Sequence, residues 1–280
     1  MKLGEALMAA QARIAACSDS PRLDAELLLG HVLGLGRAQV FARLHDELPA
    51  AEAQEFEALV ARRARGEPVA YLTGEKGFWS LCLAVTPAVL VPRPETELLV
   101  EWGLDIIAAG RAPCIADLGT GSGALALALA SERADAQVDA TDASSAALDV
   151  ARANAERLDL RQVRFHQGHW FDALPGRRYD LIVSNPPYIA HDDAHLATLR
   201  HEPLTALTDG ADGLSALREI VAGAAGHLND GGWLLVEHGY DQGAAVRELF
   251  ARAGFGNIST RRDYGGNERA TAGQRAPEHA

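Results

Sequence analysis

The clearest indication of the fold is Ile115-Ala116-Asp117-Leu118-Gly119-Thr120-Gly121-Ser122-Gly123. Its first four residues are typical of a buried strand, and a helix-forming segment from Ala124 to about Ser131 follows the glycines. Glycine is needed where the backbone turns tightly and a ligand must approach without a Cβ in the way. In doubly wound sheets, ligands bind at the carboxyl ends of the strands. The segment therefore predicts an α/β fold with a binding loop at residues 119–123.

Strand and helix patterns continue to alternate after this loop. We expect strands at residues 137–141, 163–165, 179–184 and 233–237, helices at 146–158, 214–228 and 242–253, and a closing hairpin at 257–262 and 268–273. Such alternation predicts a doubly wound, mostly parallel sheet with helices on both faces.

Asp142 ends the strand that follows the glycine loop, nineteen residues after Gly123. A carboxylate at this position can accept hydrogen bonds from both hydroxyls of an adenosine ribose. The pattern Gly119-x-Gly121-x-x-Ala124 also fits the dinucleotide fingerprint, with Asp142 in the ribose position. The loop alone therefore predicts a nucleoside site and leaves an NAD-dependent dehydrogenase as an alternative.

A second motif, Ser184-Asn185-Pro186-Pro187-Tyr188, ends the predicted strand at residues 179–184. Each proline fixes its own φ and pushes the preceding residue to an extended conformation, so the corner is stiff. The Asn185 side chain and the Pro186 carbonyl offer two fixed acceptors beside the Tyr188 ring. This set suits a planar NH2 group, although Asn-Pro-Pro is also ordinary turn chemistry.

Composition narrows the classes of function. The chain has 280 residues, 48% of them apolar, and no apolar run approaches a membrane span. The first residues lack a secretory pattern, and three widely spaced cysteines suggest a reducing compartment, so we expect a cytoplasmic protein without a membrane partner. A net charge of −12 argues against duplex DNA as the main partner.

Two further sets of polar residues are candidates for a site. The spacing His191-x-x-x-His195 suits two metal ligands on a helix, but no third ligand stands out, so a charged surface loop is favoured and no metal is predicted. Glu237-His238 ends a predicted strand and could either line the site or only finish the sheet, so both stay outside the predicted catalytic set.

The chain divides into three predicted regions. Residues 1–72 show only helical patterns, including Pro21 at a helix start and Gly34 at its end, and predict a small bundle for recognition or scaffolding. Residues 73–92 predict a connecting hairpin between runs 78–85 and 89–91. Residues 93–280 form the α/β domain, which opens with a helix after Pro94.

Taken together, the motifs resemble a known family. Residues 117–123 resemble motif I of the S-adenosylmethionine methyltransferases, and residues 185–188 resemble their motif for methylating planar amino nitrogens. The whole chain resembles the HemK/PrmC-type peptide-chain release factor glutamine methyltransferases, also through Tyr71-Leu72-Thr73-Gly74, Pro92-Arg93-Pro94-Glu95-Thr96-Glu97, Glu237-His238-Gly239 and Arg262-Asp263-Tyr264-Gly265-Gly266-Asn267-Glu268-Arg269. One departure is His201, where the family has an aromatic residue.

The resemblance implies a seven-stranded class I methyltransferase sheet and a substrate-recognition role for residues 1–72. It implies methyl transfer from S-adenosyl-L-methionine, leaving S-adenosyl-L-homocysteine, to the side-chain amide nitrogen (N5) of the glutamine in the Gly-Gly-Gln loop of release factors. Carried over by position, the cofactor residues are Gly119, Thr120, Gly121, Ser122, Gly123, Asp142, Trp170 and Asn185. The substrate residues are Asn185, Pro186, Pro187 and Tyr188, of which Asn185, Pro186 and Tyr188 are the catalytic ones.

Beside the NAD-dependent dehydrogenase, two other substrates for the same chemistry and one other role for Trp170 remain open. Adenine in nucleic acid presents the same planar NH2 group, so an adenine-N6 methyltransferase would also use this corner. A ribosomal-protein glutamine methyltransferase would keep the chemistry and change the protein substrate. For Trp170, the adenine-covering role implied by the resemblance competes with that of an ordinary core aromatic.

Overall fold

The computed structural model describes residues 1–107, 111–174 and 176–277. The chain forms two compact units, Met1–Glu75 and Lys76–Ala280. No helix within the described ranges is long and apolar enough to cross a bilayer.

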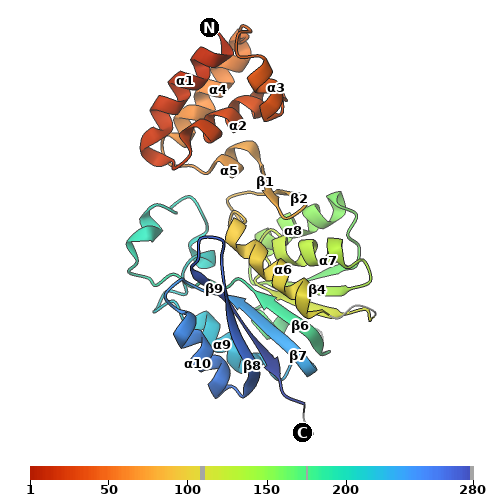
Figure 1. The fold of residues 1–280 in the computed structure, drawn as a ribbon. Helices are drawn as coiled ribbons and strands as arrows, with labels where there is room; N and C mark the ends of the chain where they lie inside the picture. The colour runs from red at the N-terminus through yellow and green to blue at the C-terminus, as the bar shows by residue number, and fades with distance from the viewer. Residues whose placement is uncertain (108–110, 175, 278–280) are drawn as a thin grey trace. The chain divides into compact units, whose positions relative to one another are not determined.

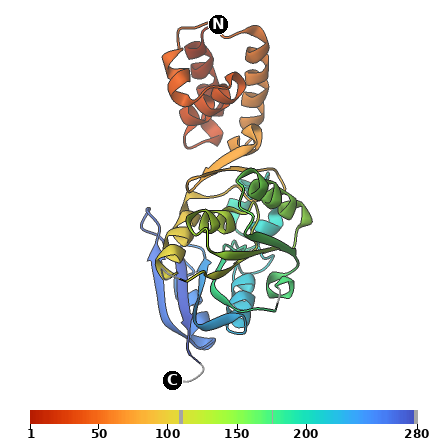
Figure 2. The same cartoon turned by 90° about the vertical axis from the view of Figure 1, so that its right-hand side faces the viewer.

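The N-terminal unit is built of helices, as its sequence predicts, and they are coloured red to orange in Figure 2. The α-helices are α1 (Leu3–Ile14), α2 (Pro21–Leu33), α3 (Arg37–Ala42), α4 (Ala50–Arg63) and α5 (Val69–Thr73), with a short 3-10 helix, η1 (Ala15–Cys17). Helix α2 begins at Pro21 and ends before Gly34, whose φ of 63° lies in the left-handed region. A core of leucine, alanine and other apolar side chains from α1, α2 and α4 holds the bundle.

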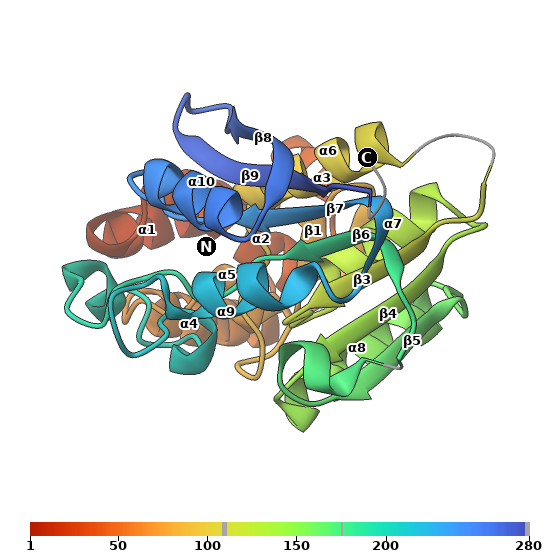
Figure 3. The ribbon, with the colours of Figure 1, turned by 90° about the horizontal axis from the view of Figure 1, so that it is seen from below.

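The second unit contains a seven-stranded sheet of order β5-β4-β3-β6-β7-β9-β8, which Figure 3 shows from one edge to the other. The strands are β3 (Cys114–Leu118), β4 (Gln137–Asp142), β5 (Val163–Gln167), β6 (Tyr179–Ser184), β7 (Leu228–Glu237), β8 (Phe255–Arg262) and β9 (Glu268–Arg275). Strands β3 to β7 pair in parallel, and β9 pairs antiparallel with β7 and β8. The predicted mostly parallel sheet and closing hairpin are confirmed.

Helices cover both faces of this sheet (Figure 1). Helices α6 (Glu97–Ile106), α7 (Ala124–Glu132) and α8 (Ser145–Arg157) lie on one face, and α9 (Ser215–Ala224) and α10 (Gly243–Arg252) lie on the other. The two faces have separate apolar cores. Helix α7 contributes a continuous buried run, Ala124–Ala130, because it packs in the middle of the first layer.

Two predicted element bounds are wrong. The hairpin pairs β1 (Glu75–Phe78) with β2 (Leu81–Ala84), whereas residues 89–91 are not a strand. The turn falls inside the apolar run because Trp79 adopts a φ of 56°, held by a 2.9 Å bond from its backbone N–H to Glu97 and a 2.7 Å bond from its indole to Glu132. The helix predicted to reach residue 228 ends at Ala224, and the longer strand β7 begins at Leu228.

The register of the parallel strands sets the level of their carboxyl ends. Leu118 of β3 pairs with Thr141 of β4 and with Ser184 of β6, and Ser184 pairs with Val236 of β7. The Ser184 hydroxyl also donates a 2.7 Å hydrogen bond to the Leu118 carbonyl. The next residue of each strand or loop therefore lies at one edge of the sheet; these are Asp142, Gly119, Asn185 and Glu237.

Candidate active site

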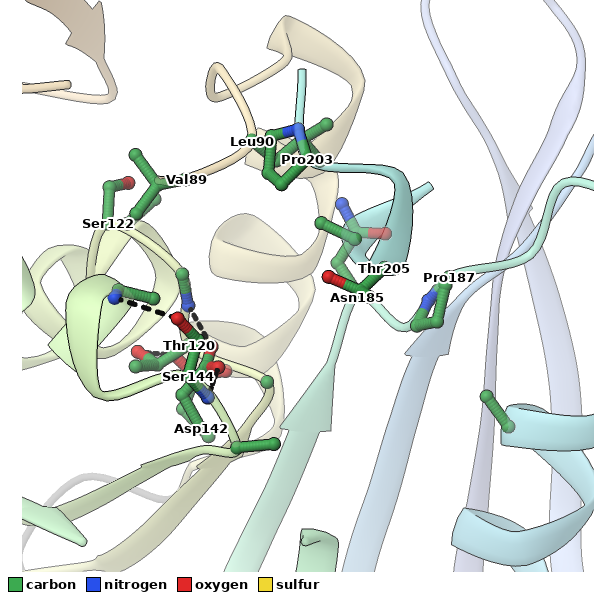
Figure 4. A pocket seen from close by; sticks show the side chains of 18 of the residues that line it. Val89, Leu90, Thr120, Ser122, Asp142, Ser144, Asn185, Pro187, Pro203 and Thr205 are labelled. Atoms are coloured by element: carbon green, nitrogen blue, oxygen red, sulfur yellow. Dashed lines mark hydrogen bonds between the residues drawn. The ribbon is translucent and has the colours of Figure 1, made fainter. Parts of the chain in front are cut away.

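A cavity of about 760 Å³ opens at this edge of the sheet. Most residues predicted from the sequence line it, namely Gly119, Thr120, Gly121, Ser122, Asp142, Trp170, Asn185 and Pro187. Figure 4 shows Thr120, Asp142 and Ser144 on one side and Asn185, Pro187 and Thr205 on the other, with Val89, Leu90 and Pro203 beyond them. The glycine loop and the proline corner therefore face the same space.

The glycine loop has the backbone that only glycine adopts easily. Gly119, Gly121 and Gly123 have φ values of 74°, 55° and 86°. A Cβ at Gly121 would meet no atom within 4 Å, so the backbone there borders open space, whereas a Cβ at Gly119 would lie 3.1 Å from Cζ3 of Trp170. The loop is held to β4, because the N–H groups of Gly119 and Thr120 both donate to the Thr141 carbonyl, at 2.9 and 2.8 Å.

Asp142 is oriented by backbone groups. Its Oδ2 accepts from the Gly121 N–H at 2.9 Å, and its Oδ1 accepts from the Ser144 N–H at 2.8 Å. Each carboxylate oxygen keeps acceptor capacity beyond one hydrogen bond. The half-buried carboxylate on the cavity wall is therefore fixed to the glycine loop and can still bind hydroxyl groups.

Asp117 lies beneath the loop and is fully buried. Its Oδ2 accepts from the Thr120 hydroxyl at 2.6 Å and from the Ala126 N–H at 3.1 Å, which ties the loop to the first turn of α7. Burial raises the pKa of Asp117 to about 7, and these two hydrogen bonds offset only part of that effect.

Trp170 begins η3 (Trp170–Ala173) with a φ of 40°, an unusual value for a bulky residue. Its ring packs against Gly119 on the cavity wall. Its indole Nε1 is buried and has no hydrogen-bond partner among the residues that the structure describes. The ring thus lies beside the glycine loop and also packs against the apolar core on the α9 and α10 face of the sheet.

The proline corner divides its four residues between two environments. Asn185 and Pro187 line the cavity, whereas Pro186 is buried and, like Tyr188, is not part of the wall within the described ranges. The Tyr188 hydroxyl donates a 3.0 Å hydrogen bond to Oε1 of Glu237. The side chain of Asn185 donates from Nδ2 to Oγ1 of Thr96 at 3.0 Å.

Thr96 and Glu237 are absent from the predicted site. Thr96 ends η2 (Pro94–Thr96), and its hydroxyl donates a 2.7 Å hydrogen bond to Oε2 of Glu237. Glu237 is only 1% exposed at the end of β7. Burial raises its pKa to about 7, against the hydrogen bonds from Thr96 and Tyr188 and the positive charge of Arg269. A parallel register between β6 and β7 would have placed Glu237 beside Asn185, but the sequence does not fix that register.

A second missed contact supports the cavity wall. Glu202 is buried, pairs with Arg93, and accepts a 3.0 Å hydrogen bond from the Val91 N–H. Arg93 and Pro203 both line the cavity, so this ion pair joins the segment before η2 to the loop after β6. Glu202 therefore anchors this loop next to His201.

No group of three or more metal-ligating side chains occurs within residues 1–107, 111–174 and 176–277. His191 and His195 are both exposed, and His191 precedes the short helix η4 (Ala194–Ala197) instead of sharing a long helix with His195. The Nδ1 of His191 lies 3.0 Å from the Ala211 carbonyl.

Comparisons with known proteins agree with this architecture. The family model "PrmC N-terminal domain" matches residues 5–74, and "Methyltransferase small domain" matches residues 96–253. The release factor glutamine methyltransferase of Xylella fastidiosa is 53% identical over 255 residues, covering 90% of this chain and 93% of the relative. That of Coxiella burnetii is 48% identical over 275 residues, covering 98% and 99%. A solved methyltransferase from Pyrococcus furiosus has the same fold, with a TM-score of 0.53 at 20% identity over 69% of this chain and 88% of its own.

Proposed function

Since the chain belongs to the family of release factor glutamine methyltransferases, we propose that it methylates the N5 side-chain amide nitrogen of a release factor glutamine. The glutamine in question is the one in the Gly-Gly-Gln loop, and S-adenosyl-L-methionine is the donor. The observation that carries the proposal is the pairing of Leu118 with Ser184, because it puts the glycine loop and the proline corner on one cavity.

The residues on the cavity wall fit this donor. The open space beside Gly121 admits a ligand close to the backbone. Asp142 has acceptor capacity for two ribose hydroxyls, and the flat face of Trp170 suits an adenine ring. When bound, S-adenosyl-L-methionine supplies the methyl group as a sulfonium and leaves as S-adenosyl-L-homocysteine. The proposed chemistry uses no metal.

The proline corner prepares the acceptor amide. An amide nitrogen is a poor nucleophile, because its lone pair is shared with the carbonyl. In our proposal Oδ1 of Asn185 and the Pro186 carbonyl accept its two N–H bonds, which raises electron density on nitrogen and fixes its direction. The rate then comes mainly from positioning and from acceptors aimed at the developing positive charge. A strong general base is unnecessary, because the proton can leave after the methyl group has been transferred.

Membership of this family removes the dehydrogenase alternative for the glycine loop. Adenine in nucleic acid and a ribosomal-protein glutamine stay as competing substrates for the same corner. The net charge of −12 disfavours a nucleic acid. We also propose that the N-terminal bundle helps to bind the release factor, and that the enzyme works in the cytoplasm, where release factors act.

Transfer of labelled methyl from S-adenosyl-L-methionine to purified release factor tests the proposal. We expect label on wild-type release factor and none on a variant whose Gly-Gly-Gln glutamine is replaced by alanine. Equal labelling of the two release factors, or labelling of ribosomal protein or nucleic acid alone, would contradict it.

A further inference from the structure

The proposed reaction requires Asn185 to present its oxygen, and not its nitrogen, to the substrate. A carboxamide is nearly symmetric in shape, so a half-turn about its last side-chain bond exchanges an acceptor for a donor. Donors facing the substrate NH2 group would repel it. Some other part of the protein must therefore choose between two orientations that occupy almost the same volume.

The hydrogen bonds of Thr96, on the side of Asn185 away from the substrate, select the orientation of the Asn185 amide. The Thr96 hydroxyl has one proton, and at 2.7 Å that proton goes to Oε2 of Glu237. The Thr96 oxygen is then left as an acceptor, which matches Nδ2 of Asn185 at 3.0 Å. In the reversed orientation, two oxygens would face each other without a proton between them. The structure records no hydrogen bond to Oδ1 of Asn185 from any described residue, so this atom is available to the cavity.

Glu237 in its ionised form only accepts hydrogen bonds. Tyr188 donates to its Oε1 at 3.0 Å, and Thr96 donates to its Oε2. Burial raises the pKa of Tyr188, which keeps its hydroxyl protonated and donating. Glu237 is 1% exposed and is not among the described residues of the cavity wall, so it acts on the substrate through the residues that it binds, and its path to Asn185 runs through Thr96.

We infer that Thr96 and ionised Glu237 are positioning residues that hold the Asn185 amide with its oxygen toward the substrate. This inference rests on the proposed function and adds two residues to it. Their relay runs from β7 through η2 to the end of β6, which are three segments far apart in the sequence.

The relay predicts a dependence on pH. A protonated Glu237 can donate to Thr96, which frees the Thr96 proton for Oδ1 of Asn185 and permits the reversed orientation. Burial raises the pKa of Glu237 to about 7, and the charged or titratable groups facing it are Arg269 on β9, Glu95 on η2 and Tyr188 after β6. Turnover should therefore fall as the pH drops below about 7.

The first test compares Thr96→Val with Thr96→Ser. Valine keeps the shape and removes the hydroxyl, so we expect kcat for release factor methylation to fall about tenfold, the worth of one hydrogen bond. The Kd for S-adenosyl-L-homocysteine, measured by calorimetry, should stay within about twofold, because the described hydrogen bonds of the Thr96 hydroxyl go to Glu237 and Asn185 and not to the glycine loop or Asp142. Serine should restore most of kcat. Equal loss in both variants, or a loss of ligand affinity that matches the loss of kcat, would overturn the inference.

The second test uses Glu237→Gln, with Glu26→Gln in the N-terminal bundle as the matched control. Glutamine at 237 does not titrate, so the fall in kcat below about pH 7 should disappear, and kcat at pH 8 should drop about tenfold. Glu26→Gln should keep the wild-type profile. Asp117 also has a pKa raised to about 7 and is unchanged in both variants. A fall that persists in Glu237→Gln would have another origin, such as Asp117, and would overturn the role of Glu237.

Failure of this inference differs from failure of the proposed function. If wild-type enzyme transfers no methyl group to release factor, the function is wrong. If wild-type enzyme is active and both Thr96→Val and Glu237→Gln fold, bind S-adenosyl-L-homocysteine and keep full kcat, only the relay is wrong.

Discussion

Glu26 in the helical bundle and Glu237 in the sheet are both almost fully buried, and the two are surrounded differently. Glu26 of the helical bundle is 2% exposed and Glu237 of the sheet is 1% exposed. Glu26 lies under Arg22 and Arg37, which form ion pairs with it at 2.9 and 2.8 Å. Glu237 instead receives hydrogen bonds from two neutral hydroxyls, those of Thr96 and Tyr188.

The surroundings move the two pKa values in opposite directions. Burial raises the pKa of Glu26, but the hydrogen bonds and charges of Arg37 and Arg22 outweigh it, so the pKa lies below its ordinary value. Burial raises the pKa of Glu237 to about 7, because the hydrogen bonds from Thr96 and Tyr188 and the charge of Arg269 offset only part of this effect. A carboxylate neutralised by arginines suits a structural ion pair, whereas a carboxylate bound by hydroxyls orients those hydroxyls and the groups behind them.

The largest effect is expected from substitution of Asn185, which is the last residue of the relay from Glu237 through Thr96. Asn185→Ala removes the acceptor itself, and we expect kcat to fall about 100-fold or more, as for loss of a group that stabilises developing charge. The Kd for S-adenosyl-L-homocysteine should change far less, because Asp142 and the glycine loop are intact. Steady-state kinetics with release factor, together with calorimetry, measure both; equal losses would place Asn185 mainly in cofactor binding.

The next effect concerns stability and has opposite signs for the two glutamates. A carboxyl whose pKa is higher in the folded than in the unfolded state binds more protons when folded, so its contribution to stability falls as pH rises. For Glu237 this happens between its ordinary pKa of 4.5 and about 7. The free energy of unfolding of Glu237→Gln, relative to wild type, should therefore rise by about 2 kcal/mol from pH 5 to pH 7.

Glu26→Gln should behave in the opposite way. Because the pKa of Glu26 is lowered, its contribution is present above the ordinary pKa of 4.5 and is lost as pH falls through the folded value. The two arginines are largely exposed, so we expect a loss of about 1 kcal/mol at neutral pH that vanishes in acid. Urea unfolding of each variant from pH 3 to pH 8 measures both trends; parallel curves would erase the distinction between the two glutamates.

The smallest effect should come from Tyr188→Phe. The ring stays, Thr96 still donates to Glu237, and only one of two hydroxyl donors is lost. We expect kcat to fall about threefold, from the partial loss of one hydrogen bond, with an unchanged Kd for S-adenosyl-L-homocysteine. A fall as large as that of Asn185→Ala would instead place the hydroxyl in the reaction itself.

The sequence was sufficient where the information is local. The glycine loop, the prolines after β6 and the alternation of strands and helices each depend on a few neighbouring residues, and the structure confirms the sheet that they predict. The strand bounds of the hairpin were predicted wrongly because the turn at Trp79 is not marked by glycine, asparagine or proline. The apolar residues 89–91 suggested a strand, but Val89 and Leu90 line the cavity.

The relay from Glu237 through Thr96 to Asn185 could not be predicted from local sequence. Thr96 and Glu237 are 141 residues apart, and their hydrogen bond exists only because η2 lies beside the end of β7. The sequence predicts an ordinary helix start at Pro94-Glu95-Thr96, and it predicts an ordinary strand end at Glu237. Only the order and register of the strands show that both lie next to Asn185. The assignment of Trp170 to adenine and of Asn185 to the substrate amide stays a prediction.

Because the parallel strands end at the same level, few insertions or deletions can be accepted within them. Side chains alternate between the two faces of a strand, so inserting or deleting one residue within β7 would turn Glu237 away from Thr96 while leaving Asn185 where it is. Helices and surface loops are free of that constraint. Insertions and deletions should therefore accumulate outside β3, β4, β6 and β7, because the register of these strands determines which side chains meet at their carboxyl ends.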